Sequence, residues 1–314
     1  MEKKKGNGVG IRHLSYYLPE QRVSIEELAR RIKLSDERLK VYQTVRRLKC
    51  VRMSDESAGD MAVKVGRQAL IDSGIDPLEI DAVVFFHSLY NMSFAPASLV
   101  GRIQHELGLT RSLSLAVTGQ GCASINSATR LSRDMIVAGS AKTVMVIGAD
   151  AMQESRSREL NGISVVGDGA SVMILQKDCE ANRFIEISSF DEGYFHCVAD
   201  WDKKDQDNFD LVYMIASARL VQRTLRRANL TLDQIKILIP HNVNYSSWDR
   251  IIALLKLDPA KFFGENIATN GHAYGTDVVV NLADAIAAGK IQKGDYVLLM
   301  SAGMGTLGCA IIQH

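Results

Sequence analysis

The sequence has little cysteine, little proline, almost no net charge and no long apolar run. Its five cysteines in 314 residues are too few, and odd in number, for a disulfide framework, so we expect reduced thiols. The 37 basic and 36 acidic residues leave a net charge of +1, which provides no overall field to attract nucleic acid or an anionic membrane. Five prolines and 24 glycines exclude fibrous and linker-like classes.

Neither the apolar runs nor the N-terminal segment carries a membrane or export signal. The longest apolar runs, such as residues 83–86 and 297–300, have the length of strands and are too short to span a bilayer. Residues 1–8 are basic and polar, and charge interrupts the segment behind them, so the apolar centre of a signal peptide is missing. We therefore expect a cytoplasmic protein that binds neither membrane nor nucleic acid.

What the sequence does contain is an alternation of short apolar runs with longer helical patterns. Hydrophobic residues make up 46% and charged residues 23%, as in globular proteins. Strands that read as continuous apolar runs between helices predict an α/β fold whose sheet is covered on both faces. We expect strands at 82–86, 112–117, 143–147, 171–175, 235–239 and 296–300, and helices at 58–72, 96–107, 123–137, 211–228, 246–255 and 277–288.

Two stretches of the sequence repeat each other. Cys122 opens a predicted helix that ends at Ala138-Gly139, and His272 opens one that ends, at the same spacing, at Ala288-Gly289. A predicted strand follows each helix, and similar segments upstream lead into strands in the same order. Coincidence of common Ala-Gly helix ends is the alternative, but two matches in register favour a duplication.

A duplication has a consequence for the placement of side chains. We expect two similar α/β halves, residues 1–178 and 179–314. If a pseudo-twofold axis relates them, the starts of the two equivalent helices face each other, and Cys122 meets His272 at one central site. Each residue would then lie at a helix N-terminus, where free backbone N–H groups favour negative charge.

A glycine-rich segment near the C-terminus imitates a nucleotide-binding motif. Residues 303–308 read G-x-G-x-x-G, the dinucleotide fingerprint. That fingerprint needs a following helix and strand, and the chain after Gly308 is too short for both. We therefore predict a tight turn between two final strands, which can direct backbone N–H groups into a pocket.

Three residues in this framework have side chains suited to catalysis. Cys122 lies among small residues between a predicted strand and a helix, where a helix N-terminus favours a thiolate nucleophile. His241 follows the strand 235–239, and α/β proteins place functional groups at the carboxyl ends of strands. His272 is a candidate because it stands at the position of the repeat that is equivalent to Cys122. The alternative for each is an ordinary buried residue, and because their spacing is not that of zinc ligands we expect no metal.

Four segments, spread from about Gly10 to Ile312, form a specific combination. They are Tyr17-Leu18-Pro19-Glu20, Gly167-Asp168-Gly169-Ala170, Pro240-His241-Asn242-Val243-Asn244 and Ala302-Gly303-Met304-Gly305. In this combination the sequence resembles the β-ketoacyl-acyl-carrier-protein synthase III family of the thiolase superfamily. The resemblance implies the five-layered αβαβα thiolase fold, which is itself a duplication.

The resemblance also implies an acyltransferase that condenses thioesters and holds no permanently bound cofactor. Cys122 would take an acyl group from a thioester of coenzyme A or of acyl carrier protein, with the oxyanion held by the backbone N–H groups of Cys122 and Gly303. A malonyl-type thioester would then lose CO₂, and its enolate would attack the acyl-cysteine to give a 3-oxoacyl product. His241 and His272 would stabilise the enolate oxygen by donating hydrogen bonds.

Further expectations carried by the resemblance concern assembly and substrate binding. The family is homodimeric, and its loop equivalent to residues 89–96 reaches the acyl pocket of the partner. We therefore expect a homodimer in which Phe94 or a neighbour helps to close that pocket. Asn244, from the His241 motif, is assigned to substrate binding together with Phe94.

The sequence departs from the class III pattern in three places. The class carries Asn in a Gly-Asn-Thr-Ser context, where this chain has Gly271-His272-Ala273-Tyr274, so the catalytic set is Cys-His-His, as in elongating ketoacyl synthases. The Trp that stacks on coenzyme A is missing from residues 36–52, and Ser246 replaces an Arg. Residues 38–52 instead carry basic charges only, which suit the acidic surface of an acyl carrier protein. The alternative is a solvated basic helix and loop.

Two other functions remain open at this point. The acyl group on Cys122 could pass to an alcohol or an amine without decarboxylation, as in secondary metabolism. The chain could also be a non-catalytic partner subunit of a heteromeric synthase, although its Cys, His and His argue against that.

Overall fold

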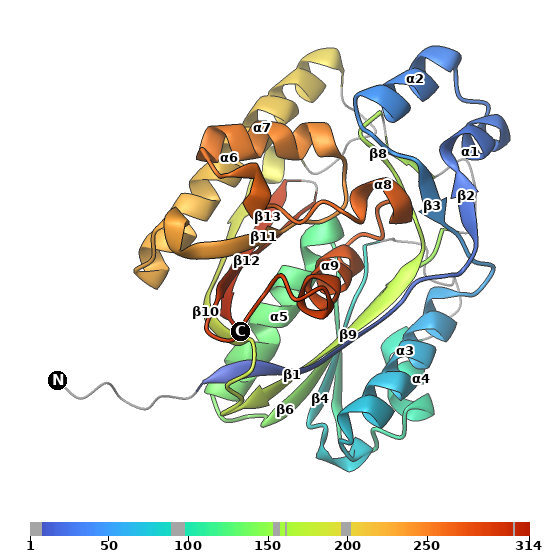
Figure 1. The fold of residues 1–314 in the computed structure, drawn as a ribbon. Coiled ribbons are helices and arrows are strands. Elements are labelled where there is room, and N and C mark those ends of the chain that lie inside the picture. Colours follow the sequence, from blue (N-terminus) through green and yellow to red (C-terminus); the bar gives the residue numbers. More distant parts are fainter. Residues whose placement is uncertain (1–7, 89–97, 153–157, 161, 196–201, 304) are drawn as a thin grey trace.

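Both halves of the chain form the same succession of elements in the computed structural model, which describes residues 8–88, 98–152, 158–160, 162–195, 202–303 and 305–314 (Figure 1). The succession is strand, helix, strand, helix and two further strands. In the first half these are β1 (Val9–Tyr17), α3 (Ala58–Ser73), β4 (Ala82–Phe86), α5 (Ser124–Val137), β6 (Thr143–Asp150) and β9 (Gly169–Lys177). In the second half they are β10 (Arg183–Asp191), α6 (Lys203–Ala228), β11 (Ile235–Ile239), α9 (Thr276–Ala287), β12 (Tyr296–Ala302) and β13 (Thr306–Gln313).

Shorter elements are inserted between these common ones. The first half adds β2 (Arg22–Ser24), α1 (Ile25–Ile32), α2 (Asp36–Thr44), β3 (Cys50–Arg52), α4 (Leu99–Glu106), β5 (Leu113–Val117), β7 (Glu159–Leu160) and β8 (Ser164–Val165). The second half adds α7 (Tyr245–Leu255) and α8 (Ile267–Asn270). None of the described helices is long and apolar enough to cross a membrane.

The larger strands join in one nine-stranded sheet of order β11-β12-β13-β10-β1-β9-β6-β4-β5. In the first half β4 runs parallel to β6, and β9 runs antiparallel to β6. In the second half β11 runs parallel to β12, and β13 runs antiparallel to β12. The halves meet where β1 pairs with β10 at Gly10 and Arg183. A Cβ atom on Gly10 would lie 2.4 Å from the carbonyl oxygens of Cys179 and Ala181, so only glycine lets the segment between β9 and β10 pass this close to β1.

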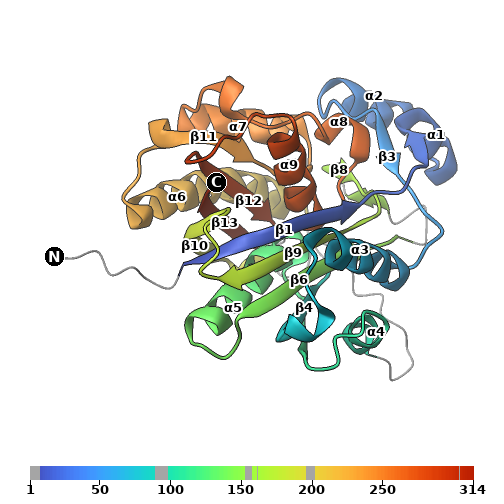
Figure 2. The same cartoon turned by 60° about the horizontal axis from the view of Figure 1, so that its bottom comes forward.

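Alternate residues of each strand pack into different core clusters, because side chains in a strand alternate between its faces. On β4, Val84 packs with α5 and α9, whereas Val83 packs with α3 and α4. On β12, Leu299 packs with α5 and α9, whereas Leu298 packs with α6 and α7. Figures 1 and 2 show the result, with α5 and α9 between the strands of the two halves and the other helix pairs outside. The expected five-layered αβαβα fold is confirmed.

The link between the halves is short. β9 ends at Lys177 and β10 begins at Arg183, so the first strand of the second half follows almost directly on the last strand of the first half. We propose residues 178 and 179 as the boundary between the two halves.

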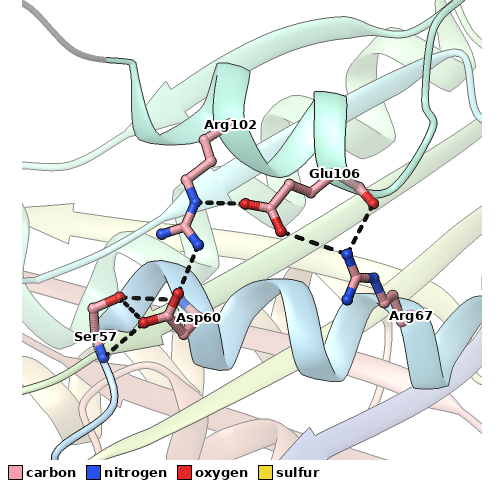
Figure 3. A network of polar contacts seen from close by, with 5 residues as sticks. All are labelled: Ser57, Asp60, Arg67, Arg102 and Glu106. Atoms are coloured by element: carbon pink, nitrogen blue, oxygen red, sulfur yellow. Dashed lines mark hydrogen bonds and ion pairs between the residues drawn. The ribbon is translucent and has the colours of Figure 1, made fainter.

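A polar network on the surface joins α4 to α3 (Figure 3). Arg102 contacts Asp60 at 2.6 Å and Glu106 at 2.7 Å, and Glu106 also contacts Arg67 at 3.5 Å. Ser57 and Asp60 form a capping box at the start of α3. Since these side chains are solvated, each ion pair contributes at most about 1 kcal/mol. The network therefore acts as a brace for α4 and lies apart from the site described next.

Candidate functional site

Cys122 lies in a tight turn that leads from β5 into α5. Gly119 and Gly121 adopt positive φ angles of 88° and 52°, and a short 3₁₀ turn, Gly121–Ala123, precedes α5. The turn between β12 and β13 packs directly on this backbone, because a Cβ atom on Gly303 would lie only 2.0 Å from the carbonyl oxygen of Gln120. The side chain of Cys122 is 8% exposed. The backbone at Gly303 and the turn that carries Cys122 therefore pack directly against each other.

His272 comes from the equivalent position in the second half and lies against Cys122. Its Nε2 atom is 2.8 Å from Sγ of Cys122. The backbone of His272 is fixed by two hydrogen bonds to the first half, from its N–H to the carbonyl of Val165 and from the N–H of Gly167 to its carbonyl. The convergence of Cys122 and His272 predicted from the repeat is thus confirmed.

The other ring nitrogen of His272 contacts a carboxylate that the sequence did not reveal. Nδ1 of His272 is 2.5 Å from Oδ2 of Asp277, and both side chains are buried. Asp277 also accepts hydrogen bonds from the backbone N–H groups of Asn242 at 2.7 Å and Ala273 at 2.9 Å. A continuous chain of polar contacts therefore runs from Cys122 through His272 to Asp277. The only sequence signal for Asp277 is an acidic residue in the first turn of the helix that follows His272.

Electrostatics give His272 a positive charge at neutral pH. Burial lowers the pKa of His272, but the negative charges of Cys122 and Asp277 outweigh burial and raise the pKa to about 10. A cation beside a cysteine is the arrangement that generally favours a thiolate nucleophile.

A chain of amides behind the carboxylate fixes its position. The side chain of Asn242 donates to Asp277 at 3.3 Å, and Asn281 donates to Asn242 at 2.8 Å and to the carbonyl of Pro240 at 2.8 Å. Asn281 in turn accepts a hydrogen bond from Asn266 at 2.9 Å. Because Asn242, Asp277 and Asn281 are buried, each polar contact is costly to lose.

His241 lies beside His272 but differs from it in charge. The two ring centroids are 5.5 Å apart. Burial, and next the positive charge of His272, hold the pKa of His241 well below its usual value, so this imidazole is neutral. Its backbone carbonyl accepts a hydrogen bond from the indole of Trp248 at 2.9 Å. Among the described residues, Nδ1 of His241 has no hydrogen-bond partner.

The two backbone donors expected to form an oxyanion hole differ in availability. Within the described part of the chain, no acceptor is found for the backbone N–H of Cys122. The N–H of Gly303 donates to the carbonyl of Thr306 at 2.8 Å, inside its own turn. A role for Gly303 as a second donor requires that bond to be shared or opened, and it stays a prediction.

The structure gives Asn244 a local role. Its side chain caps α7 by accepting a hydrogen bond from the N–H of Ser247 at 2.8 Å, and its amide donates to the carbonyl of Ile163 at 3.0 Å. Substrate binding by Asn244 stays a prediction. Phe94, the other residue assigned to substrate binding, lies outside the described residues.

The basic stretch between residues 38 and 52 makes mostly internal contacts. Arg46 donates to the carbonyl of Gly162 and to Ser246, Arg47 pairs with Asp249, and Arg52 donates to Asn270. Ser246 stands where the family pattern has an Arg. Its hydroxyl accepts a hydrogen bond from Arg46, which lies just after the C-terminal end of α2. Docking of an acidic carrier protein on this stretch stays a prediction.

Comparisons with known proteins match this architecture along the whole chain. A model of 3-oxoacyl-[acyl-carrier-protein] synthase III matches residues 118–193, and the model of the C-terminal part of the same family matches residues 225–314, together just over half of the chain. A beta-ketoacyl-[acyl-carrier-protein] synthase III of Clostridium perfringens is 24% identical over 336 residues and covers 100% of both chains.

Solved structures show the same fold. The 3-oxoacyl-[acyl-carrier-protein] synthase III of Aquifex aeolicus has a TM-score of 0.85 at 22% identity, covering 98% of this chain and 100% of that one. ChlB3, described as an acyltransferase, has a TM-score of 0.84 at 22% identity, covering 98% of this chain and 97% of that one.

The fold and the Cys–His pair define a condensing enzyme with a thiolase-like architecture. More closely, the chain belongs to the 3-oxoacyl-[acyl-carrier-protein] synthase III family, with distant similarity to its known members. Enzymes of this family use acyl thioesters as substrates. Within the described residues, no group of three or more His, Cys, Asp and Glu side chains is arranged to hold a metal ion.

Proposed function

We propose that the protein transfers acyl groups through a thioester on Cys122. The observation that carries this proposal is the 2.8 Å contact between Sγ of Cys122 and Nε2 of His272 at the turn before α5. The thiolate attacks the carbonyl carbon of an acyl thioester, the bond from that carbon to the donor sulfur breaks, and the donor thiol leaves with a proton from His272. The backbone N–H of Cys122, with Gly303, stabilises the oxyanion.

The second stage is a decarboxylative condensation. A malonyl-type thioester releases CO₂, and the resulting enolate carbon attacks the acyl carbonyl. The bond to Sγ then breaks, which releases a 3-oxoacyl thioester and restores the thiolate. His241 and His272 stabilise the enolate oxygen, because the two imidazole rings are neighbours with centroids 5.5 Å apart.

The position of Asp277 favours a second kind of acceptor for the acyl group, an alcohol or an amine. A histidine held between a nucleophile and a carboxylate is the arrangement of a general base that activates a hydroxyl or an amine. Acylation of Cys122 removes one of the two negative charges that raise the pKa of His272. Loss of that charge lowers the pKa of His272, and His272 in its neutral form can take a proton from an alcohol or amine. Transfer to such an acceptor, without decarboxylation, is our second candidate function.

The substrates and setting follow from the same proposal. The donors are thioesters of acyl carrier protein or coenzyme A, and the absence of a Trp from residues 36–52 favours the carrier protein. We place the enzyme in the cytoplasm, where its free cysteines, among them Cys50 and Cys179, stay reduced. We also propose a homodimer, in which Phe94 lies at the acyl pocket of the partner.

The experiment that tests the function separates its two stages. Intact mass spectrometry after incubation with acetyl and malonyl thioesters should show one acyl group on wild type and none on Cys122→Ala. CO₂ release from a malonyl thioester supports condensation, whereas transfer of the acyl group to an alcohol or amine without CO₂ release supports the second candidate. An acyl group that still accumulates on Cys122→Ala at the wild-type rate contradicts the proposal. A wild-type protein that takes up none points to the non-catalytic subunit.

A further inference from the structure

The side chain of Cys122 lies among apolar neighbours. Among the described residues, Val166 and Tyr274 form a buried cluster with Cys122, and Leu160 packs against it. Tyr274 is 6% exposed, and its ring centroid lies 5.3 Å from that of His272. An acyl group bonded to Sγ must share this space with the ring of Tyr274.

The backbone holds the ring of Tyr274 in this place. Tyr274 has a φ angle of 53°, in the left-handed region that is unfavourable for a large side chain. Its carbonyl accepts the N–H of Asp277, and a Cβ atom on the next residue, Gly275, would lie 2.8 Å from the ring of Phe86. The segment between His272 and α9 is therefore closely packed, and this packing holds the backbone that carries the ring.

The phenol of Tyr274 is neutral, so its effect on a substrate is one of volume and not of charge. Burial, and next the negative charges of Asp150 and Cys122, raise the pKa of Tyr274 far above its usual range. A fixed, uncharged ring in a close-packed interior excludes other groups of similar size, because packed interiors do not compress.

We propose that Tyr274 sets the upper size of the acyl group that Cys122 accepts. Acetyl and propionyl groups fit beside the ring, whereas medium-length chains such as octanoyl collide with it. This inference rests on the proposed function, because it concerns the group that Cys122 carries.

Acylation by thioesters of different length tests the proposal directly. Tyr274→Gly removes the ring and suits the left-handed backbone, and Tyr274→Phe is the matched control that keeps the ring. We expect wild type and Tyr274→Phe to load acetyl faster than octanoyl by about tenfold or more, the discrimination that a size-limited pocket achieves. In Tyr274→Gly that ratio should fall by about tenfold. Circular dichroism and thermal melting confirm that the variants are folded.

Alkylation keeps this test separate from the test of the proposed function. N-ethyl and N-octyl iodoacetamide probe the room around Sγ without any thioester chemistry, and peptide mapping reads Cys122 and the partly exposed Cys179 separately. The ethyl-to-octyl ratio of labelling rates should fall in Tyr274→Gly at Cys122 and stay constant at Cys179. If thioesters fail to load but this ratio changes, the proposed function fails and the role of Tyr274 stands. Equal ratios at Cys122 in wild type and Tyr274→Gly overturn that role.

Discussion

The two candidate reactions, condensation with a malonyl thioester and transfer to an alcohol or amine, differ most in how strongly each depends on Asp277. Hydrogen-bond donors to an enolate are supplied by the two imidazoles, with or without a carboxylate behind them. Activation of a hydroxyl or amine, in contrast, requires His272 to accept a proton while Asp277 orients and stabilises the resulting imidazolium through the 2.5 Å contact.

We therefore expect Asp277→Asn to affect the two reactions unequally. Transfer to an alcohol or amine should fall on the order of 10²- to 10⁴-fold, as for loss of the carboxylate that orients a catalytic histidine. Release of CO₂ from a malonyl thioester should fall much less, because His241 and His272 remain. Single-turnover rates for each reaction, measured on the two proteins, make the comparison. A transfer rate unchanged by the substitution would remove Asp277 from the mechanism.

The raised pKa of His272 also has a consequence for stability. A group whose pKa is higher in the folded than in the unfolded state stabilises the fold fully below its unfolded value and loses that effect as the pH rises through its folded value. For His272 the unfolded value is 6.5 and the folded value about 10. The melting temperature of wild type relative to His272→Gln should therefore be greatest below pH 6.5 and decline towards pH 10. A difference that stays constant over this range would show that His272 is not charged in the folded protein.

At the scale of elements, the site depends on the close packing of two turns. The β12–β13 turn approaches the Cys122 turn so closely that a Cβ atom on Gly303 would lie 2.0 Å from a backbone oxygen. Backbone atoms, unlike the ends of flexible side chains, are unable to move aside without shifting the turn that carries the nucleophile.

Gly303→Ala should therefore impair both stability and acylation. Overpacking of this kind costs about 1–3 kcal/mol, and a shift of the Cys122 turn should slow loading of the acyl group. Gly193→Ala is the control, since nothing lies within 4 Å of a Cβ atom there. Urea unfolding and the rate of acyl-enzyme formation give the two measurements. Wild-type values for both in Gly303→Ala would contradict the close contact.

The elements that the sequence predicted well are those with continuous apolar runs. The strands at 82–86 and 235–239 agree with β4 and β11, and the helix at 123–137 agrees with α5 to within one residue. β1 and β10 were missed because polar and charged residues such as His13 and Glu186 interrupt them. Such strands depend on pairing with neighbours, which a local pattern does not contain.

The sequence also predicted only part of the candidate site. The repeat placed Cys122 and His272 at equivalent positions, and symmetry alone brought them together. Asp277 was not found, because its partnership with His272 depends on the turn at Gly271 and Tyr274, both of which have positive φ angles. Long-range contacts of this kind follow from the folded backbone and leave no regular spacing in the sequence.

At the scale of the whole molecule, β5 lies at one end of the nine-stranded sheet. β5 pairs with β4 on one side, and the sheet order gives it no neighbour among the described strands on the other. Leu113, at its start, is 54% exposed. Free strand edges with apolar side chains are surfaces at which chains pair. We therefore propose that two chains of the homodimer pair along this edge.

Light scattering at micromolar concentration should accordingly give twice the 34.6 kDa mass of the chain. Leu113→Asp should shift the protein towards monomer, because a charge at the edge opposes pairing, and should leave the fold of each chain intact because the side chain is exposed. Leu254→Asp, at a site 50% exposed on α7, is the control and should leave the dimer unchanged. If acyl loading on Cys122 falls together with the dimer, the partner contributes to the acyl pocket, as predicted for Phe94. A wild-type protein that is monomeric at this concentration contradicts the assembly, and full loading by a monomeric variant contradicts the role of the partner.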